Sequence, residues 1–490
     1  MFDVNPSAFH APLRIASALA VAATLAACAS LDRAPLTTSQ IDASALGAKS
    51  VPIEWPSEDW WRRYDDPQLD SLIADGITGS PTLAAARARI ARAQAAASAA
   101  RAPLLPEISG NANSTYQRYS ENYIFPPPLG GSWNSDNRLT LDFNYEFDFW
   151  NKNRAALEAA LSQAQAAAAD EQAARLVLTT NIARAYFDLQ RFFAQREVSL
   201  AAITQREEVV RLTAQRFAAG LDTKVEAKQA DAALGTVRTE LAQYDEAIAV
   251  ARIQIAALVG AGPQRGDALA AAKGMRAPPT VLPSVVPLDL VGRRPEIVAS
   301  RWRVEAAQHD IEVARAEFYP NVNLVAFIGL SSIGFPNLFA AGSTIAGVGP
   351  AIHLPIFEGG RLNANLRGRE ADSALAVSAY DEAVIDAVRD VAEALAAING
   401  LARTSAEQAR AREATTDAYN LAVVRYKAGL GNYLTVLTAQ TQQLVQDRLD
   451  ADLRARALEL DVNLARALGG GYAEESSLNL SAAPGVAGAR

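Results

Sequence analysis

The chain has 490 residues, of which 50% are hydrophobic and only 7% aromatic, so alanine supplies much of the apolar fraction. Alanine is the strongest helix former, and this composition favours long helices over a sandwich of short strands. A formal net charge of −8 argues against a dedicated nucleic-acid-binding protein, which usually carries a basic excess. A single cysteine excludes a disulfide scaffold, and the three histidines, at positions 10, 309 and 353, have neither metal-ligand nor triad spacing. We therefore expect no metal, no cofactor, no enzymatic activity and no nucleic-acid partner.

The first 28 residues have the pattern of a bacterial export signal. Arg14 precedes an apolar run over residues 15–27 that ends in small residues and is too short to span a bilayer comfortably. The stretch LAAC that ends at Cys28 resembles a lipobox, in which the cysteine becomes the acylated N-terminus and several acyl chains anchor the protein. We predict a signal peptide over residues 1–27 and lipidation at Cys28. In lipoproteins of the kind that this stretch resembles, alanine rather than aspartate at position 29 favours transfer to the outer membrane. The alternative is a plain secretory signal with a chance cysteine.

Three motif pairs recur in the same order in the two halves of the chain. The segment from Pro81 to Pro106 has the same length as that from Pro295 to Pro320, and each begins an alanine-rich or charged helix pattern. The second pair consists of residues 216–221 (RFAAGL) and 425–430 (RYKAGL), which lie 209 positions apart, and residues 149–154 parallel residues 356–361. These matches predict a tandem duplication, with repeats over 66–280 and 281–470. An extended N-terminal segment over 28–65 precedes them, and a flexible tail over 471–490 follows.

Each half is expected to contain two strands. Residues 138–149 alternate strictly between apolar and polar side chains, which predicts a strand with one apolar face, long enough to cross a membrane at a tilt. Its partner, at about 107–119, is polar throughout, and a Pro/Gly-rich loop over 123–133 separates the two. The second half has strand patterns at 321–330 and 345–354. Four strands are too few to close a barrel, so either the sheet is soluble or several chains share one barrel.

The remaining segments predict very long helices. No proline interrupts residues 151–218, and a 4,3 spacing predicts a coiled-coil seam there. The seam consists of Ile182, Tyr186, Leu189, Phe193, Arg196, Leu200, Ile203, Glu207, Val210, Ala214 and Phe217. After Gly220 a return helix runs to about residue 260, and the second half repeats this hairpin over 360–468. The fold class is therefore mainly α, with two antiparallel coiled-coil hairpins and four strands per chain.

Several ordered stretches together resemble one family, the outer-membrane efflux factors of the TolC/OprM/NodT type in their lipoprotein form. They are residues 60–73, 145–154, 288–297, 318–320, 355–362, 425–437 and 467–471. The resemblance implies a homotrimer in which three chains form a 12-stranded membrane β-barrel and a helical tunnel, with the apolar face of residues 139–149 toward lipid. It also implies a lipid-anchored exit duct in the outer membrane that exports drugs or other small solutes, joined to an inner-membrane pump by a periplasmic adaptor. A structural coiled-coil spacer of the cell envelope is the alternative function.

The resemblance also places a gate at the turns of the two helical hairpins, at Gly220 and Gly429. Family members often carry aspartates after the second of these glycines, but the matching positions here are Thr435 and Thr438. The acids lie in the first repeat instead, as Asp222 and Glu226, and three copies of each would form an acidic ring that selects cations. The alternative is that these acids are solvated charges at a helix start.

By the same resemblance the two hairpin tips would contact the adaptor. The candidate contact residues are Arg216, Gly220 and Leu221 in the first tip and Arg425, Gly429 and Leu430 in the second.

Overall fold

The structure is a computed structural model and describes residues 40–49, 53–272, 287 and 289–474. The predicted signal peptide, Cys28 and most of the predicted C-terminal tail lie outside the described residues. In both halves two helices precede a pair of strands, and two long helices follow the strands. In the first half these are α2 Pro67–Gly79, α3 Pro81–Arg101, β1 Glu107–Arg118, β2 Trp133–Glu146, α4 Lys152–Ala218 and α5 Lys224–Leu258, followed by the short α6 Gln264–Asp267. The second half has the short α7 Leu290–Arg293, then α8 Pro295–Ala316, β3 Asn321–Ile333, β4 Thr344–His353, α9 Arg361–Lys427 and α10 Tyr433–Ala467.

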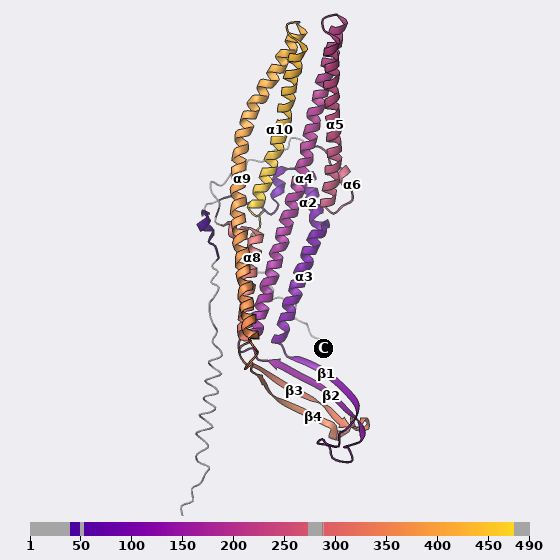
Figure 1. Cartoon of the computed structure of the whole chain (residues 1–490), viewed down its shortest axis with the longest axis vertical. Coiled ribbons are helices and arrows are strands. Elements are labelled where there is room, and N and C mark those ends of the chain that lie inside the picture. The colour runs from indigo at the N-terminus through magenta and orange to yellow at the C-terminus, as the bar shows by residue number, and fades with distance from the viewer. Residues whose placement is uncertain (1–39, 50–52, 273–286, 288, 475–490) are drawn as a thin grey trace, which may run out of the picture. The chain divides into compact units, whose positions relative to one another are not determined.

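The helix lengths confirm the internal repeat. Both α4 and α9 have 67 residues, and both α5 and α10 have 35. In each repeat the long helix and its return helix run side by side as an antiparallel hairpin (Figure 1). The predicted hairpins are thus present, and their bounds lie within a few residues of the predicted ones, because glycine and proline mark the ends.

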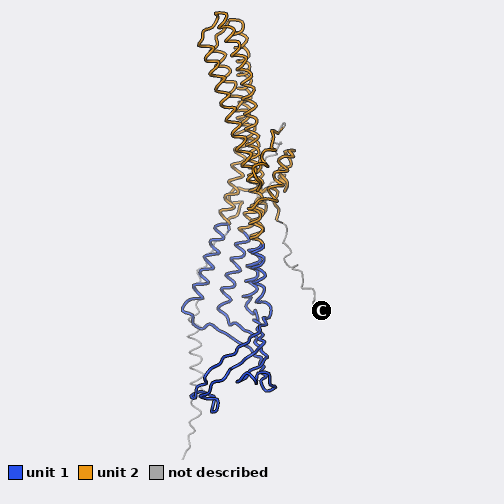
Figure 2. The backbone as a smooth tube through the Cα atoms, turned by 90° about the vertical axis from the view of Figure 1, so that its right-hand side faces the viewer, with its two compact units in different colours: residues 1–40, 91–164, 301–379 blue, residues 41–90, 165–300, 380–490 orange. Residues whose placement is uncertain are grey.

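The chain divides into two compact units, and each unit is assembled from both repeats (Figure 2). The first comprises residues 1–40, 91–164 and 301–379 and contains all four named strands. The second comprises residues 41–90, 165–300 and 380–490 and contains both hairpin tips.

The four strands of the first unit form one antiparallel sheet in the order β1-β2-β3-β4. Paired residues project to the same face, and the register pairs Leu139 with Leu330 and Leu141 with Ile328, so β2 and β3 share an apolar face. The prediction that the first strand is polar throughout was wrong, because its register places Ile108 opposite Phe143, on that same face. Small and polar residues separate the few apolar ones in β1, so the apolar face of this strand is weak in the sequence.

The bounds of β2 also differ from the predicted strand 138–149. The strand begins at Trp133, which was assigned to the loop, and ends at Glu146. It ends there because Asp148 caps the next helix: its carboxylate accepts hydrogen bonds from the backbone amides of Asn153 (3.1 Å) and Arg154 (2.8 Å).

The second unit has a hydrophobic core where α2 and the 3₁₀ turn Trp60–Tyr64 meet α4, α5 and α10. Fully buried side chains include Leu69, Ile182 and Val462, and each contributes about 1.5–3 kcal/mol by leaving water. The Tyr186 hydroxyl donates to Asp66 Oδ2 at 2.7 Å, and Asp66 also caps α2. Among the described residues, no helix is long and apolar enough to cross a membrane.

The predicted seam of α4 is correct up to Leu189. In the C-terminal part of the helix, each buried position lies one residue before the predicted one. Beyond that point the most buried positions are Gln195, Ser199, Ala202, Arg206, Val209 and Thr213. Two of the polar residues in this seam, Gln195 and Arg206, make hydrogen bonds to neighbouring helices. The Gln195 amide, for example, donates to Asp452 Oδ1 (2.9 Å) and to the Arg448 carbonyl (3.0 Å) of α10. An apolar pattern therefore could not locate the seam.

Candidate functional site

The two hairpin tips of the second unit have the same backbone geometry. In each tip a glycine with φ +74° follows the long helix, at Gly220 and at Gly429. The next residue donates its amide to a carbonyl five residues back, Leu221 to Arg216 and Leu430 to Arg425, both at 2.9 Å. This is the αL helix end that glycine tolerates best. The repeated sequence therefore produces two matching turns.

The return helices start with different caps. Thr223 and Glu226 form a capping box at the start of α5, with the Thr223 amide donating to Glu226 Oε2 at 2.8 Å. Hydrogen bonds from Thr223 lower the pKa of Glu226 below its ordinary value. At the start of α10, Asn432 Oδ1 accepts from the Thr435 amide (3.0 Å) and hydroxyl (2.8 Å). Glu226 and Thr435 are thus used in helix caps, and Thr438 is exposed on α10.

Asp222 has a different environment, because its carboxylate is held by residues of both hairpins. Arg216 of α4 pairs with it through two contacts, Nε to Oδ2 at 2.9 Å and Nη2 to Oδ1 at 3.3 Å. The Tyr426 hydroxyl of α9 donates to Asp222 Oδ2, and Arg216 Nη1 donates to the Tyr426 carbonyl at 3.2 Å. The Arg216 guanidinium also lies 4.5 Å from the centre of the Tyr426 ring. We call Arg216, Asp222 and Tyr426 the tip cluster.

The tip cluster is well shielded from solvent. The side chains of Arg216 and Asp222 are 14% and 11% exposed, and Tyr426 is 1% exposed. Tyr426 also belongs to an apolar cluster that packs helices of the two hairpins together, with Val209, Ala230, Tyr433 and Val436 among its members. The polar contacts of the tip cluster therefore lie next to an apolar cluster to which both hairpins contribute.

Charge and hydrogen bonding set the ionisation of the tip cluster. Burial by itself raises the pKa of Asp222, but hydrogen bonds from Arg216 and Tyr426, together with the Arg216 charge, outweigh it and lower the pKa below its ordinary value. Burial, followed by the bond to Asp222, raises the pKa of Tyr426. The carboxylate is thus ionised and the phenol protonated over the whole physiological range.

Apolar side chains cover the outside of both tips. In the first tip Phe217, Leu221 and Val225 are exposed, and in the second Leu430 and Leu434. Leu221 is 65% and Leu430 71% exposed, although both are large apolar residues. Such a cluster of exposed apolar side chains is typical of a surface that binds another protein.

The structure separates the predicted site residues into three environments. Asp222 and Arg216 lie together in the tip cluster, whereas Glu226 and Thr435 serve caps, and Leu221 and Leu430 are exposed. Arg216 was predicted as an adaptor contact, but its guanidinium is engaged within the chain. Arg425 does remain exposed, with one 3.5 Å contact to the Leu430 carbonyl.

Sequence reasoning missed Tyr426 as a site residue. The repeat alignment places it at the position of Phe217, 209 residues earlier, so the added hydroxyl was the available signal.

Comparisons with known proteins agree with this architecture. The profile of the family described as "Outer membrane efflux protein" matches twice, over residues 72–261 and 286–470. The fusaric acid resistance protein FusA of Burkholderia cepacia is 40% identical over 362 residues, covering 72% of this chain and 68% of the relative. The multidrug resistance outer membrane protein MdtP of Escherichia coli (strain K12) is 32% identical over 431 residues, with 85% and 87% covered.

Solved structures show the same similarity. The outer membrane protein VceC of Vibrio cholerae has 39% sequence identity and a TM-score of 0.79, covering 85% of this chain and all of that chain. The outer-membrane channel OprN has 27% identity and a TM-score of 0.77, with 90% of this chain covered.

Proposed function

Because the chain belongs to the outer membrane efflux protein family and is an outer-membrane efflux channel, we propose that it is the exit duct of a tripartite system. In this proposal an inner-membrane pump supplies the energy and a periplasmic adaptor joins the pump to the duct. The observation that carries it is the repeated architecture, in which long helical hairpins end in tips with exposed apolar side chains.

The sheet supports a shared assembly. Within the described chain, β1 and β4 each have one edge with no partner strand, and such edges invite pairing with another chain. A homotrimer would join three sheets into twelve strands and leave no free edge. Residues such as Leu141 and Ile328 on the shared apolar face would then meet lipid.

The tip cluster is proposed as the latch that holds the duct narrow at the hairpin tips. Its contacts join α4 and the turn after it to α9, so outward movement of one hairpin relative to the other must break them. Asp222 contributes through these contacts. Glu226, Thr435 and Thr438, also predicted at the gate, would act only as neighbouring polar side chains near the opening.

The exposed apolar residues of the tips are proposed as the adaptor surface. Leu221 and Leu430 occupy equivalent places in the two repeats, so three chains would present six similar apolar patches. An adaptor with repeated apolar contacts could therefore bind both kinds of tip.

Substrates and anchoring complete the proposal. Relatives are named for resistance to fusaric acid and to multiple drugs, and this chain is proposed to export compounds of these classes. Acylation at Cys28 would hold the mature chain on the outer membrane.

Two measurements on detergent-purified protein test the proposal. Light scattering, corrected for bound detergent, should give the mass of three chains, and planar-bilayer recordings should show discrete conductance steps. A stable monomer that forms no channel would contradict the exit duct and favour a structural spacer instead.

A further inference from the structure

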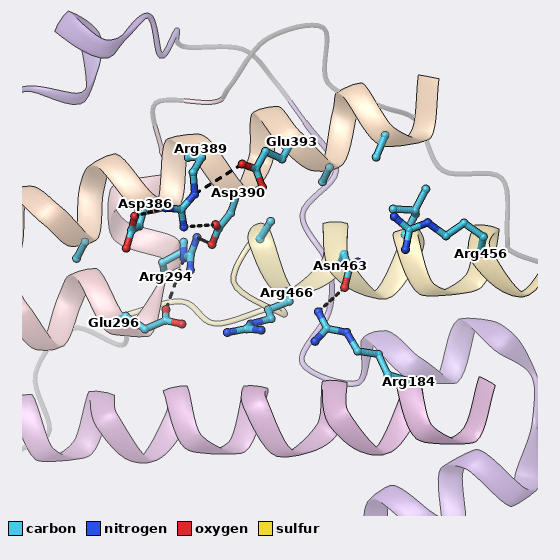
Figure 3. Close-up of a pocket in the computed structure, with 15 residues that line it drawn as sticks. Arg184, Arg294, Glu296, Asp386, Arg389, Asp390, Glu393, Arg456, Asn463 and Arg466 are labelled. Atoms are coloured by element: carbon cyan, nitrogen blue, oxygen red, sulfur yellow. Dashed lines mark hydrogen bonds and ion pairs between the residues drawn. The ribbon is translucent and has the colours of Figure 1, made fainter. Parts of the chain in front are cut away.

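A charged cavity of about 570 Å³ lies among α4, α8, α9 and α10 in the second unit. Figure 3 shows the side chains that line it. No residue of the tip cluster borders it, so it is a separate feature of the unit. Its lining includes five arginines and four carboxylates, an unusual density of charge for a helical wall of alanine and leucine.

The cavity lies on one particular face of α10. Leu460, Asn463 and Ala467 border it, and their spacing of three and four residues places them on one side of the helix. Leu458 and Val462 project to the opposite side, into the hydrophobic core that contains Trp60 and Tyr64. The cavity is therefore on the side of α10 away from this core.

The carboxylates gather on the α8 and α9 side of the cavity, where two arginines hold them. Arg389 pairs with Asp386 at 2.7 Å and with Asp390 at 3.0 Å, and it lies 3.9 Å from Glu393. Arg294 pairs with Asp390 at 3.0 Å and lies 3.6 Å from Glu296. Four carboxylates share two guanidinium groups, so this side has an excess of negative charge.

The opposite side, formed by α4 and α10, has an excess of positive charge. Arg184 donates to the amide oxygen of Asn463, but its Nε is buried without a hydrogen-bond partner. Arg466 lines the same cavity, and within the described part of the chain no hydrogen bond or ion pair of its guanidinium is found. Arg456, by contrast, pairs with Glu459 at 2.6 Å.

Arg184 lies close enough to Arg466 to experience its charge. Burial and the neighbouring Arg466 charge both lower the pKa of Arg184, and Glu459 only partly offsets them. Two half-buried guanidinium groups with no carboxylate in direct contact are unfavourable, and a bound carboxylate would stabilise both.

We propose that this cavity binds a small monocarboxylate, with the carboxylate between Arg184 and Arg466 and the rest of the molecule toward the acidic side. Guanidinium groups present planar pairs of N–H donors that match the two oxygens of a carboxylate. The acidic side repels a second anionic group, so the ligand is a monocarboxylate whose other end is neutral or cationic, and dicarboxylates are disfavoured. If the protein is an exit duct, as proposed above, this ligand is an exported solute. The substrate class is then organic acids and zwitterions.

Isothermal titration calorimetry on the full-length protein in detergent tests the proposal with four probes of one shape. Benzoate should bind and benzamide, its neutral counterpart, should not. Terephthalate, with a second carboxylate, should bind more weakly than benzoate, and 4-(aminomethyl)benzoate should bind at least as tightly. Arg184→Gln or Arg466→Gln should each weaken benzoate binding by about tenfold or more, as expected for a lost charged hydrogen bond. Arg410→Gln, at an exposed arginine of α9 that pairs with Glu407 and does not line the cavity, is the matched control and should leave the affinity unchanged.

Equal binding of benzoate and benzamide, or unchanged affinity in both variants, would overturn the proposal. Tighter binding of terephthalate than of benzoate would also contradict it. Planar-bilayer conductance of the same preparations separates this result from the exit-duct proposal. A protein that conducts but does not bind benzoate would contradict only the cavity site. A protein that binds benzoate but does not conduct would contradict only the exit-duct proposal.

Discussion

The Tyr426 hydroxyl donates a hydrogen bond to the Asp222 carboxylate across 204 positions of sequence. This contact joins the tip of the first hairpin to the long helix of the second, and Arg216 binds both residues. The charge-assisted ion pair and the ring contact of Arg216 are strong but reversible interactions. A gate needs both properties, because it must hold at rest and release when the hairpins move.

Removing the Asp222 charge should loosen the latch. In Asp222→Asn the Arg216 guanidinium loses its ion pair while the side chain keeps its size, so the channel should open more often by several-fold, as expected for loss of about 1 kcal/mol or more. Glu226→Gln, which alters only the cap of α5, is the matched control. Single-channel recordings would report both, and equal effects of the two substitutions would contradict the special role of Asp222.

The latch should also depend on pH in a defined direction. The pKa of Asp222 is below its ordinary value of 3.8, so the ion pair contributes stability above that value and loses it as pH falls through the lowered pKa. Open probability should therefore stay constant between pH 7 and about pH 5 and rise only in stronger acid. The raised pKa of Tyr426 keeps its bond intact past the ordinary tyrosine value of 10.0 on the alkaline side.

Asp222→Asn supplies the control for the acid response, since this variant should lack the step. An acid rise of the same size in the variant would assign the effect to other carboxylates.

Polar substitutions on the exposed apolar tips should separate assembly from conduction. Leu221→Ser combined with Leu430→Ser removes apolar area that an adaptor would bury but leaves the tip cluster untouched. Drug resistance of cells that depend on the channel should fall, whereas planar-bilayer conductance should stay the same. Leu375→Ser, at an exposed position of α9 outside both tips and outside the sheet, is a control for general loss of apolar surface. Undiminished resistance in the double variant would contradict the adaptor surface.

The predicted anchor has a direct chemical test. Cys28 is the only cysteine of the chain, so Cys28→Ser should abolish incorporation of labelled palmitate. Labelling that persists in the variant would show that the acyl chain is attached elsewhere or that the signal is of another kind.

Local signals in the sequence determined most of the fold. Glycine and proline mark helix ends directly, so the expected helix over 151–218 matches Lys152–Ala218 closely. The strand prediction at 138–149 failed at its end because Asp148 serves as a helix cap, and an alternating pattern carries no signal for that cap. The coiled-coil seam shifted by one residue because Gln195 and Arg206 are buried in it, and apolar spacing gives no indication of buried polar groups.

The candidate site was predicted only in part, for a related reason. The tip glycines lie within the repeated motif, and Asp222, two residues after Gly220, was predicted from the resemblance to the family. Their partner Tyr426 comes from the other hairpin, and no spacing rule connects residues so far apart in sequence. Packing of the two hairpins, rather than either sequence alone, creates the tip cluster.

The most direct test of the account is the open probability of Tyr426→Phe in a planar bilayer, with Tyr433→Phe as the control. Tyr433 is a buried neighbour whose ring centre lies 6.3 Å from that of Tyr426, and within the described residues its hydroxyl makes no bond to Asp222. If the tip cluster is the latch, Tyr426→Phe opens the channel several-fold more often than the wild type, and Tyr433→Phe behaves like the wild type. Identical gating in the wild type and Tyr426→Phe would contradict the account.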